Sequence, residues 1–152
     1  MNLPHPHTLL PQKPPMALIE EILEVGDDWI RCGATVGDEA PLKRGSASEV
    51  ISAVGLEYLA QAGAVLGGLK GGLASEGMVI SAREIHFEIC SMRKGMKLSS
   101  FVRIVAADSD TTMFEGELRD RVSQELVLRA RFTVLHRMPQ GIGENQAHER
   151  ND

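Results

Sequence analysis

The sequence has few aromatic residues and no excess of basic ones. Only four Phe, one Trp and one Tyr occur among 152 residues, and 16 Lys and Arg stand against 21 Asp and Glu, a net charge of −5. Binding of nucleic acid uses a basic surface and aromatic side chains on which bases stack. The composition therefore predicts no nucleic-acid partner.

Cysteine and histidine are also too sparse to build a disulfide framework or a metal site. Cys32 and Cys90 lie far apart without CxxC spacing, and we interpret them as two reduced thiols of a cytoplasmic protein, with a disulfide as the alternative. Metal sites in proteins use closely spaced ligands. The five histidines lack such spacing, at positions 5, 7, 86, 136 and 148. We therefore expect no zinc site.

One long apolar run resembles a membrane span at first sight. Residues 50–69 contain a single charge, Glu57, and a GxxxG pair formed by Gly63 and Gly67. A charge near the middle of a bilayer is costly, and Gln61 adds a second polar group. We therefore expect a buried helix of a soluble domain and no membrane association. The first 15 residues lack the basic and apolar regions of a signal peptide, so we expect a cytoplasmic protein.

The ends of this helix are marked by local signals. Ser46 and Glu49 have the spacing of a capping box, in which each side chain satisfies a backbone N–H of the other residue. The glycine-rich stretch 67–72 predicts the C-terminal end.

The remaining chain reads as long strands joined by turns. Gly26 and Asp27 predict a hairpin turn between the first two strands, and such long strands favour a curved antiparallel sheet. We expect one domain over 1–152, with a Pro- and His-rich arm at 1–12 and a polar, frayed tail at 138–152. The expected strands are 16–25, 28–36, 78–90, 96–107, 111–121 and 125–136.

The order of two strands, one apolar helix and four strands has an economical three-dimensional solution. A helix that is apolar all round must be covered on nearly all sides, and its small residues allow a sheet to approach closely. We therefore predict an α+β protein with the hotdog fold, in which an antiparallel sheet of about six strands wraps around a central helix. A long free sheet edge favours pairing of two chains.

Glu57 is the most unusual residue of the predicted helix. A carboxylate among apolar residues is costly when charged unless it is paired, hydrogen-bonded or neutral. Gln61 lies four residues later, on the same helix face, where its amide can orient the carboxyl group. Such a pair suits a general acid or base. The alternative is that Glu57 reaches solvent at the helix edge or pairs with a basic residue.

Two stretches resemble motifs of a known family. VGLEYLAQA, residues 54–62, resembles the helix motif Leu-Glu-Ala-Met-Ala-Gln of the 3-hydroxyacyl-acyl-carrier-protein dehydratases, which carries their catalytic acid. LLPQKPPMALIE, residues 9–20, resembles their N-terminal Leu-Pro-His-Arg-x-Pro-Met-Leu-Leu-Ile-Asp. The likeness is greater to the short dehydratase-like hotdog proteins of aryl-polyene and related polyketide or fatty-acid pathways. It extends over residues 9–136.

This resemblance implies a substrate, a reaction and a set of roles. The substrate would be a 3-hydroxyacyl thioester of acyl carrier protein, or of CoA, which loses water to give the trans-2-enoyl thioester. In the family a His removes the proton beside the carbonyl, a Glu protonates the departing hydroxyl, and a backbone N–H at the helix start polarises the carbonyl. Glu57 would be the acid and Gln61 its orienting partner. The site would form between two chains of a homodimer or a hotdog heterodimer, without a cofactor.

The sequence departs from the family in the residue that acts as base. The loop before the helix has no His, and Gln12 stands where the N-terminal motif usually has one. His7, His86 and Lys43 are possible substitutes, but each is more simply read as solvated. Lys43 and Arg44 together would attract an acidic carrier protein or a phosphopantetheine phosphate.

Three hypotheses for function therefore remain open. The first is dehydration of a 3-hydroxyacyl thioester, with Glu57 as acid. The second is thioester hydrolysis, in which Glu57 activates water and no His is needed. The third is a non-catalytic role, as an acyl-binding module or as one half of a heterodimer with a His-bearing homologue.

Overall fold

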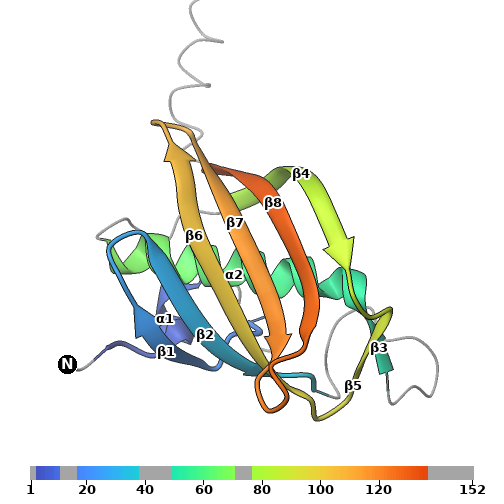
Figure 1. Ribbon diagram of the computed structural model, residues 1–152. Coiled ribbons are helices and arrows are strands. Elements are labelled where there is room, and N and C mark those ends of the chain that lie inside the picture. Colours follow the sequence, from blue (N-terminus) through green and yellow to red (C-terminus); the bar gives the residue numbers. More distant parts are fainter. Residues whose placement is uncertain (1–2, 11–16, 38–48, 71–76, 137–152) are drawn as a thin grey trace, which may run out of the picture.

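A curved antiparallel sheet of six strands lies across one side of a single long helix, α2 (Gly55–Leu69) (Figure 1). The structure is a computed structural model and describes residues 3–10, 17–37, 49–70 and 77–136. This arrangement is the predicted α+β hotdog fold. The strands of the sheet are β1 (Glu21–Val25), β2 (Trp29–Thr35), β4 (Gly77–Phe87), β6 (Lys97–Ala107), β7 (Thr111–Asp120) and β8 (Leu126–His136).

The strands lie in the order β1-β2-β6-β7-β8-β4, so β1 and β4 form the two edges of the sheet. The predicted hairpin between the first two strands is confirmed, and the N–H of Gly26 donates to the carbonyl of Trp29 at 2.9 Å. Glycine is required in this turn because the indole of Trp29 folds over it. A Cβ at position 26 would lie 2.0 Å from the indole nitrogen.

The core lies between the sheet and α2. Side chains of β7 alternate between buried and half-buried, as expected for a strand with one covered face. Phe114 stacks on Phe132 with 5.4 Å between the ring centroids. Phe114 also contacts the helix, since a Cβ at Gly63 would lie 3.0 Å from its ring. At Gly63 the absence of a side chain therefore lets the Phe114 ring pack against the helix backbone.

The predicted start of the helix is wrong. Glu49 lies in a short strand, β3 (Glu49–Ile51), which pairs with β5 (Ser91–Arg93) as Val50 lies opposite Met92. A 3₁₀ turn (Ser52–Val54) follows, and α2 begins at Gly55 without a side-chain cap. The β-branched pair at positions 50 and 51 favours an extended backbone over a helix. Ser46 lies outside the described residues, and the predicted C-terminal end at position 69 is confirmed.

The sheet leaves one side of the helix uncovered, whereas the prediction had the helix covered on nearly all sides. Leu56, Ala60 and Ala64 are only half-buried, and Gly67 is exposed. These residues recur at helical spacing, so α2 has one side that the sheet leaves open. The prediction assumed that every apolar side chain of the helix is buried within its own chain. An apolar side chain can instead be covered by a second chain.

Two strand ends differ from the prediction by more than one residue. Residues 17–20 precede β1 without belonging to it, although the N–H of Glu20 donates to the carbonyl of Gly33 at 2.9 Å. The predicted strand 78–90 ends at Phe87, and the chain then turns into β5. A register irregularity between Arg83 and His86 bends β4.

The expected arm at 1–12 contains a short helix, α1 (Pro6–Leu9). Leu9 lies against α2, as shown by the 3.2 Å that would separate a Cβ at Gly68 from the Leu9 side chain. Leu10 is buried in the core. Residues 9 and 10 of the arm therefore pack on α2 and in the core. The tail at 138–152 lies outside the described residues. Of the helices in the described ranges, none has the length and apolarity needed to cross a membrane.

Candidate functional site

Glu57 and Gln61 form a hydrogen-bonded pair on α2, as their spacing predicts. The amide Nε2 of Gln61 donates to Oε1 of Glu57 at 3.0 Å. The amide oxygen of Gln61 accepts the backbone N–H of Leu18, just before β1, at 2.7 Å. The Gln61 side chain is 1% exposed, so it connects the helix to the segment before β1 inside the protein.

The contact with Leu18 determines which end of the amide faces Glu57. A glutamine amide has one acceptor oxygen and one donor nitrogen. Because a backbone N–H can only donate, it holds the oxygen of Gln61, and the nitrogen must point the other way. The carboxyl of Glu57 therefore receives a hydrogen bond at Oε1, which leaves Oε2 to carry or accept a proton.

Glu57 lies in the first turn of α2, on the side that the sheet leaves open. It is half-buried, and within the described ranges it forms no ion pair with a basic side chain. The first turn of a helix favours a negative charge. The alternative left open by the sequence was that Glu57 reaches solvent or pairs with a basic residue. No such pair occurs within the described ranges, and the carboxyl is hydrogen-bonded to Gln61 and in part exposed to solvent.

Two buried hydroxyls lie close to Glu57 in the chain and were not singled out from the sequence. Neither Tyr58 Oη nor Ser52 Oγ has a hydrogen-bond partner within the described part of the chain. Burial, and secondarily the charge of Glu20, raises the pKa of Tyr58 to about 12. Its hydroxyl therefore remains protonated at neutral pH. In the sequence, the position of Tyr58 directly after the one acidic residue of an apolar helix could have marked this buried hydroxyl.

The other predicted binding residues lie outside the described residues. These are Gln12 in the stretch of sequence before β1, and Lys43 and Arg44 in the stretch of sequence before β3. Their assignment remains a prediction.

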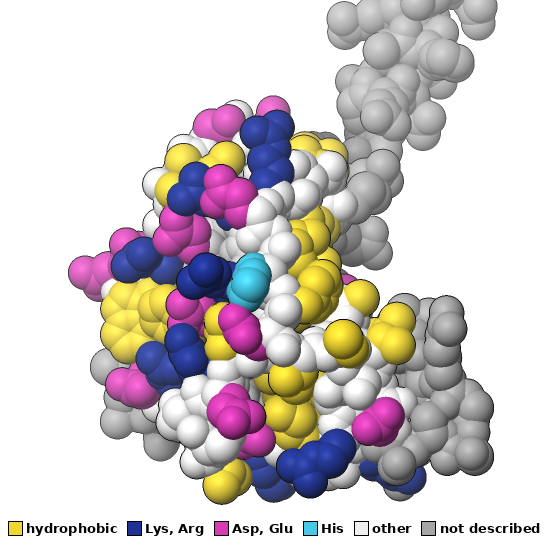
Figure 2. Space-filling model, turned by 45° about the vertical axis from the view of Figure 1, so that its right-hand side comes forward, with side chains coloured by type: hydrophobic (Ala, Val, Ile, Leu, Met, Phe, Trp, Pro, Cys, Tyr) yellow, Lys and Arg dark blue, Asp and Glu magenta, His cyan; other side chains and the backbone are white. Residues whose placement is uncertain are grey.

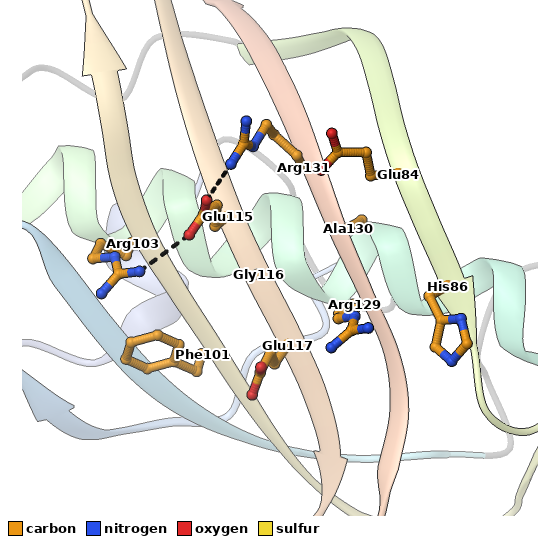
Figure 3. A pocket seen from close by; sticks show the side chains of 10 residues that line it. All are labelled: Glu84, His86, Phe101, Arg103, Glu115, Gly116, Glu117, Arg129, Ala130 and Arg131. Atoms are coloured by element: carbon orange, nitrogen blue, oxygen red, sulfur yellow. Dashed lines mark hydrogen bonds and ion pairs between the residues drawn. The ribbon is translucent and has the colours of Figure 1, made fainter.

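Neither described histidine considered as a substitute base lies beside Glu57. His7 belongs to α1, which contacts α2 near Gly68, and 11 residues of helix from Glu57 correspond to roughly 16 Å. His86 lies on β4 and lines a groove on the sheet face opposite α2, where its Nε2 lies 2.6 Å from Oε1 of Glu88 (Figure 3).

The described residues contain no group of three or more His, Cys, Asp or Glu side chains placed to hold a metal ion. The thiol of Cys32 is buried, which raises its pKa to about 12, and Cys90 is exposed. The described site offers one oriented carboxyl group, that of Glu57, which can transfer a proton.

Structural comparison confirms the fold. The dehydratase heterocomplex ApeI:P from Xenorhabdus doucetiae matches with a TM-score of 0.81 and 20% identity, over 91% of this chain and 94% of that one. The PaaI protein of the phenylacetic acid degradation operon of E. coli matches with a TM-score of 0.58 and 17% identity, over 77% and 82%. A hypothetical thioesterase with coenzyme A from Streptococcus pneumoniae TIGR4 matches with a TM-score of 0.56 and 14% identity, over 77% and 84%.

Sequence comparison assigns the family. No curated protein sequence matches the chain. The ApeP-like family, described as ApeP dehydratase, matches residues 4–144. This range includes both stretches that resemble dehydratase motifs, the segment before β1 and the helix with Glu57. Nearly the whole chain is thus covered, and the protein belongs to the ApeP-like dehydratase family.

Proposed function

We propose that this chain is the acid-bearing subunit of a dehydratase that removes water from a 3-hydroxyacyl thioester in the cytoplasm. The carrier would be an acyl carrier protein or CoA, in fatty-acid or aryl-polyene-type polyketide biosynthesis. The observation that carries this proposal is the chain of hydrogen bonds from the Leu18 backbone through Gln61 to Glu57. It holds one carboxyl group in a fixed orientation on an apolar helix, as a general acid requires.

In the proposed step a base takes the proton from C2 of the substrate. The C2–H electron pair forms the C2=C3 double bond, and the C3–O bond breaks. Oε2 of Glu57 gives its proton to the departing hydroxyl, which leaves as water. The product is the trans-2-enoyl thioester, and the atoms and electrons of the step balance without an oxidant.

The base would come from a second hotdog subunit that carries the family's histidine. Neither described candidate on this chain, His7 or His86, lies beside Glu57, whose side of α2 is open. A heterodimer would bring the missing group to that open side. The solved relative from Xenorhabdus doucetiae is a heterocomplex, which supports this form of assembly over a homodimer.

The free edge strand β4 is the proposed contact with that subunit. Among the described strands it pairs only with β8, and four of its apolar side chains are between 38% and 51% exposed. An exposed apolar edge strand offers both unpaired backbone groups and apolar area to another strand. These side chains are Val79, Ile80, Ile85 and Phe87.

The three predicted binding residues outside the described part have roles in this proposal. Lys43 and Arg44 would attract the acidic carrier protein or its phosphopantetheine phosphate, because they are adjacent cations in the loop before β3. Gln12 would help to orient the substrate, since it precedes the segment that contacts Gln61.

The test is dehydration of a 3-hydroxyacyl-carrier-protein substrate by this chain, by its His-bearing hotdog partner, and by both together. We expect turnover only with both chains. Glu57→Gln should lower the rate by about 100-fold or more, the usual range for loss of a general acid. Glu49→Gln, an exposed carboxylate on β3, is the matched control and should leave the rate unchanged.

The other outcomes separate the alternatives. Full activity of both Glu57→Gln and the parent would contradict the assigned role. Hydrolysis is the second candidate, because it needs only a water beside Glu57 and no histidine, and release of free thiol that depends on Glu57 would establish it. Acyl-thioester binding without turnover in any combination would establish an acyl-binding module.

A further inference from the structure

The edge strand β4 leaves most of its surface uncovered. Of residues 79–87, all but Ser81 are exposed. Figure 2, which brings the β4 side of the molecule forward, shows hydrophobic side chains gathered beside charged ones. An edge strand offers unpaired backbone groups, and apolar area on it favours pairing with any strand that approaches. β4 therefore needs a feature that decides which strand it accepts.

One ionisable side chain of β4 has no partner within the described part of the chain. Glu84 attracts Arg131 of β8, and Figure 3 shows the two beside each other on the sheet face opposite α2, the outer face. Nε2 of His86 lies 2.6 Å from Oε1 of Glu88. Arg83 forms neither a hydrogen bond nor an ion pair with any described residue. It is an uncompensated charge in the middle of an exposed, largely apolar strand.

The ladder between β4 and β8 determines where Arg83 points. Arg83 lies directly opposite Arg131, and residues opposite each other share one face of a sheet. Because Arg131 lines the groove on the outer face, Arg83 belongs to that face as well. β4 has one residue more than β8 between Val79 and Ser81, and again between Arg83 and His86, so it is bulged on both sides. A strand that pairs regularly with the middle of β4 therefore meets residues 81–83.

A second copy of this chain offers no counter-charge in that stretch. Side chains alternate along a strand, so only positions 81 and 83 belong to the outer face there. An antiparallel copy would place either Ser81 or its own Arg83 opposite Arg83. Neither is an acid, and covering a charge that has no counter-charge is costly. Charged side chains on edge strands prevent the pairing of identical edges in this way.

We propose that the strand pairing with β4 in the heteromeric dehydratase carries a carboxylate opposite Arg83, and that Arg83 thereby selects a different hotdog subunit over a second copy. This inference rests on the heteromeric assembly proposed above. The attraction of one partner and the rejection of the other both contribute to specificity. The structure thus defines the partner as an edge strand with an acidic residue on its outer face and apolar residues beside it, which cover the exposed Ile80 and Ile85.

The test measures binding of the two subunits separately from turnover. The probe is the His-bearing hotdog subunit of the same organism, titrated against the full chain in a calorimeter. We expect Arg83→Glu to weaken binding at least about tenfold, because it places two carboxylates opposite each other. Arg83→Lys keeps the charge and should bind nearly as well as the parent.

Arg31→Glu is the matched control, since it makes the same charge change on β2, four strands away from β4. Arg31 forms an exposed ion pair with Glu24, and such pairs contribute little to stability. Its affinity for the probe should equal that of the parent. A loss of affinity as large as that of Arg83→Glu would mean that net charge, and not the contact at β4, controls binding.

A charge exchange identifies the opposing carboxylate. The acidic residues on the edge strand of the probe are changed to Arg one at a time, and one of these variants should restore binding of Arg83→Glu. Equal affinity of the parent and Arg83→Glu, no restoring variant, or no binding of the parent to the probe would each overturn the proposal. Binding that follows these expectations without any dehydration would count against the proposed function alone.

The second half of the proposal concerns rejection of a copy. Arg83→Thr removes the charge and leaves a residue that favours strands. Its mass in sedimentation should therefore exceed that of the parent at the same concentration, because β4 of two copies can now pair. An unchanged mass at all concentrations would show that Arg83 does not exclude a second copy.

Discussion

The two faces of the sheet handle polar groups in different ways. On the side of the sheet covered by α2, Gln61 of the helix is 1% exposed, and its amide forms hydrogen bonds with one backbone N–H and one carboxyl group. On the outer face, Glu115 is held by Arg103 and Arg131 in a network that remains open to water. The side covered by α2 thus has few polar groups. Gln61 is held there by fixed partners, whereas the hydroxyls of Tyr58 and Ser52 have none within the described residues. The outer face has many charged groups that remain in contact with solvent.

This difference decides where precise chemistry is possible. A buried hydrogen bond has no competing water, so its loss leaves an unsatisfied group. An exposed ion pair is screened, and its partners can pair elsewhere. Orientation of the half-buried Glu57 therefore depends on the buried amide of Gln61, whereas the exposed charges of the outer face can exchange partners.

The largest predicted effect on stability is at Gln61. Gln61→Leu keeps the side-chain size but removes the acceptor of the buried Leu18 N–H, and we expect a loss of roughly 1–3 kcal/mol in the free energy of unfolding by urea. Ser100→Ala is the matched comparison. It removes a hydrogen bond of 3.2 Å to the Tyr58 carbonyl, which as a helix carbonyl has a second partner. Equal losses for the two variants would contradict the distinction drawn here.

The two glycines of the GxxxG pair should respond in opposite directions. A Cβ at Gly63 would lie 3.0 Å from the ring of Phe114, whereas one at Gly67 would meet no described atom within 4 Å. We expect Gly63→Ala to lower the free energy of unfolding, and with it the thermal midpoint. Overpacking should cost about 1–3 kcal/mol, of which the higher helix propensity of Ala returns up to about 1 kcal/mol. Gly67→Ala should raise the free energy of unfolding by up to about 1 kcal/mol, and the thermal midpoint should rise with it. A rise for both would show that the inner face is not tightly packed at Phe114.

The fold was predictable because its signals are local. The single apolar helix and the long alternating strands fix the α+β class, and the turn at Gly26 fixes the first hairpin. The start of α2 was not predictable from Ser46 and Glu49, because pairing of β3 with β5 brings together residues more than 40 positions apart. Tertiary pairing of this kind overrides a local capping signal.

The candidate site was predictable only in part. The spacing of Glu57 and Gln61 gave their mutual hydrogen bond, since helix geometry fixes neighbours four residues apart. The contact from Gln61 to Leu18 spans 43 positions, and no pattern along the chain encodes it. The open side of α2 could not be foreseen either, because apolar residues that face a second chain look the same in sequence as those of a core.

The smallest predicted effect is at Glu115 on the outer face and depends on pH. Hydrogen bonds from Arg131 and then Arg103 hold the pKa of Glu115 below its usual value of 4.5. A lowered pKa adds stability above the unfolded value, and this stability is lost as the pH falls through the folded value. The difference in urea midpoint between the parent and Glu115→Gln should therefore be constant from neutral pH to about 4.5 and shrink below it. Added salt should also reduce this difference, because the network is exposed.

Glu125→Gln, at a carboxylate without an ion pair among the described residues, is the matched control and should leave the midpoint unchanged. A difference that already disappears between pH 7 and 5 would mean that the arginines do not stabilise the charged form of Glu115.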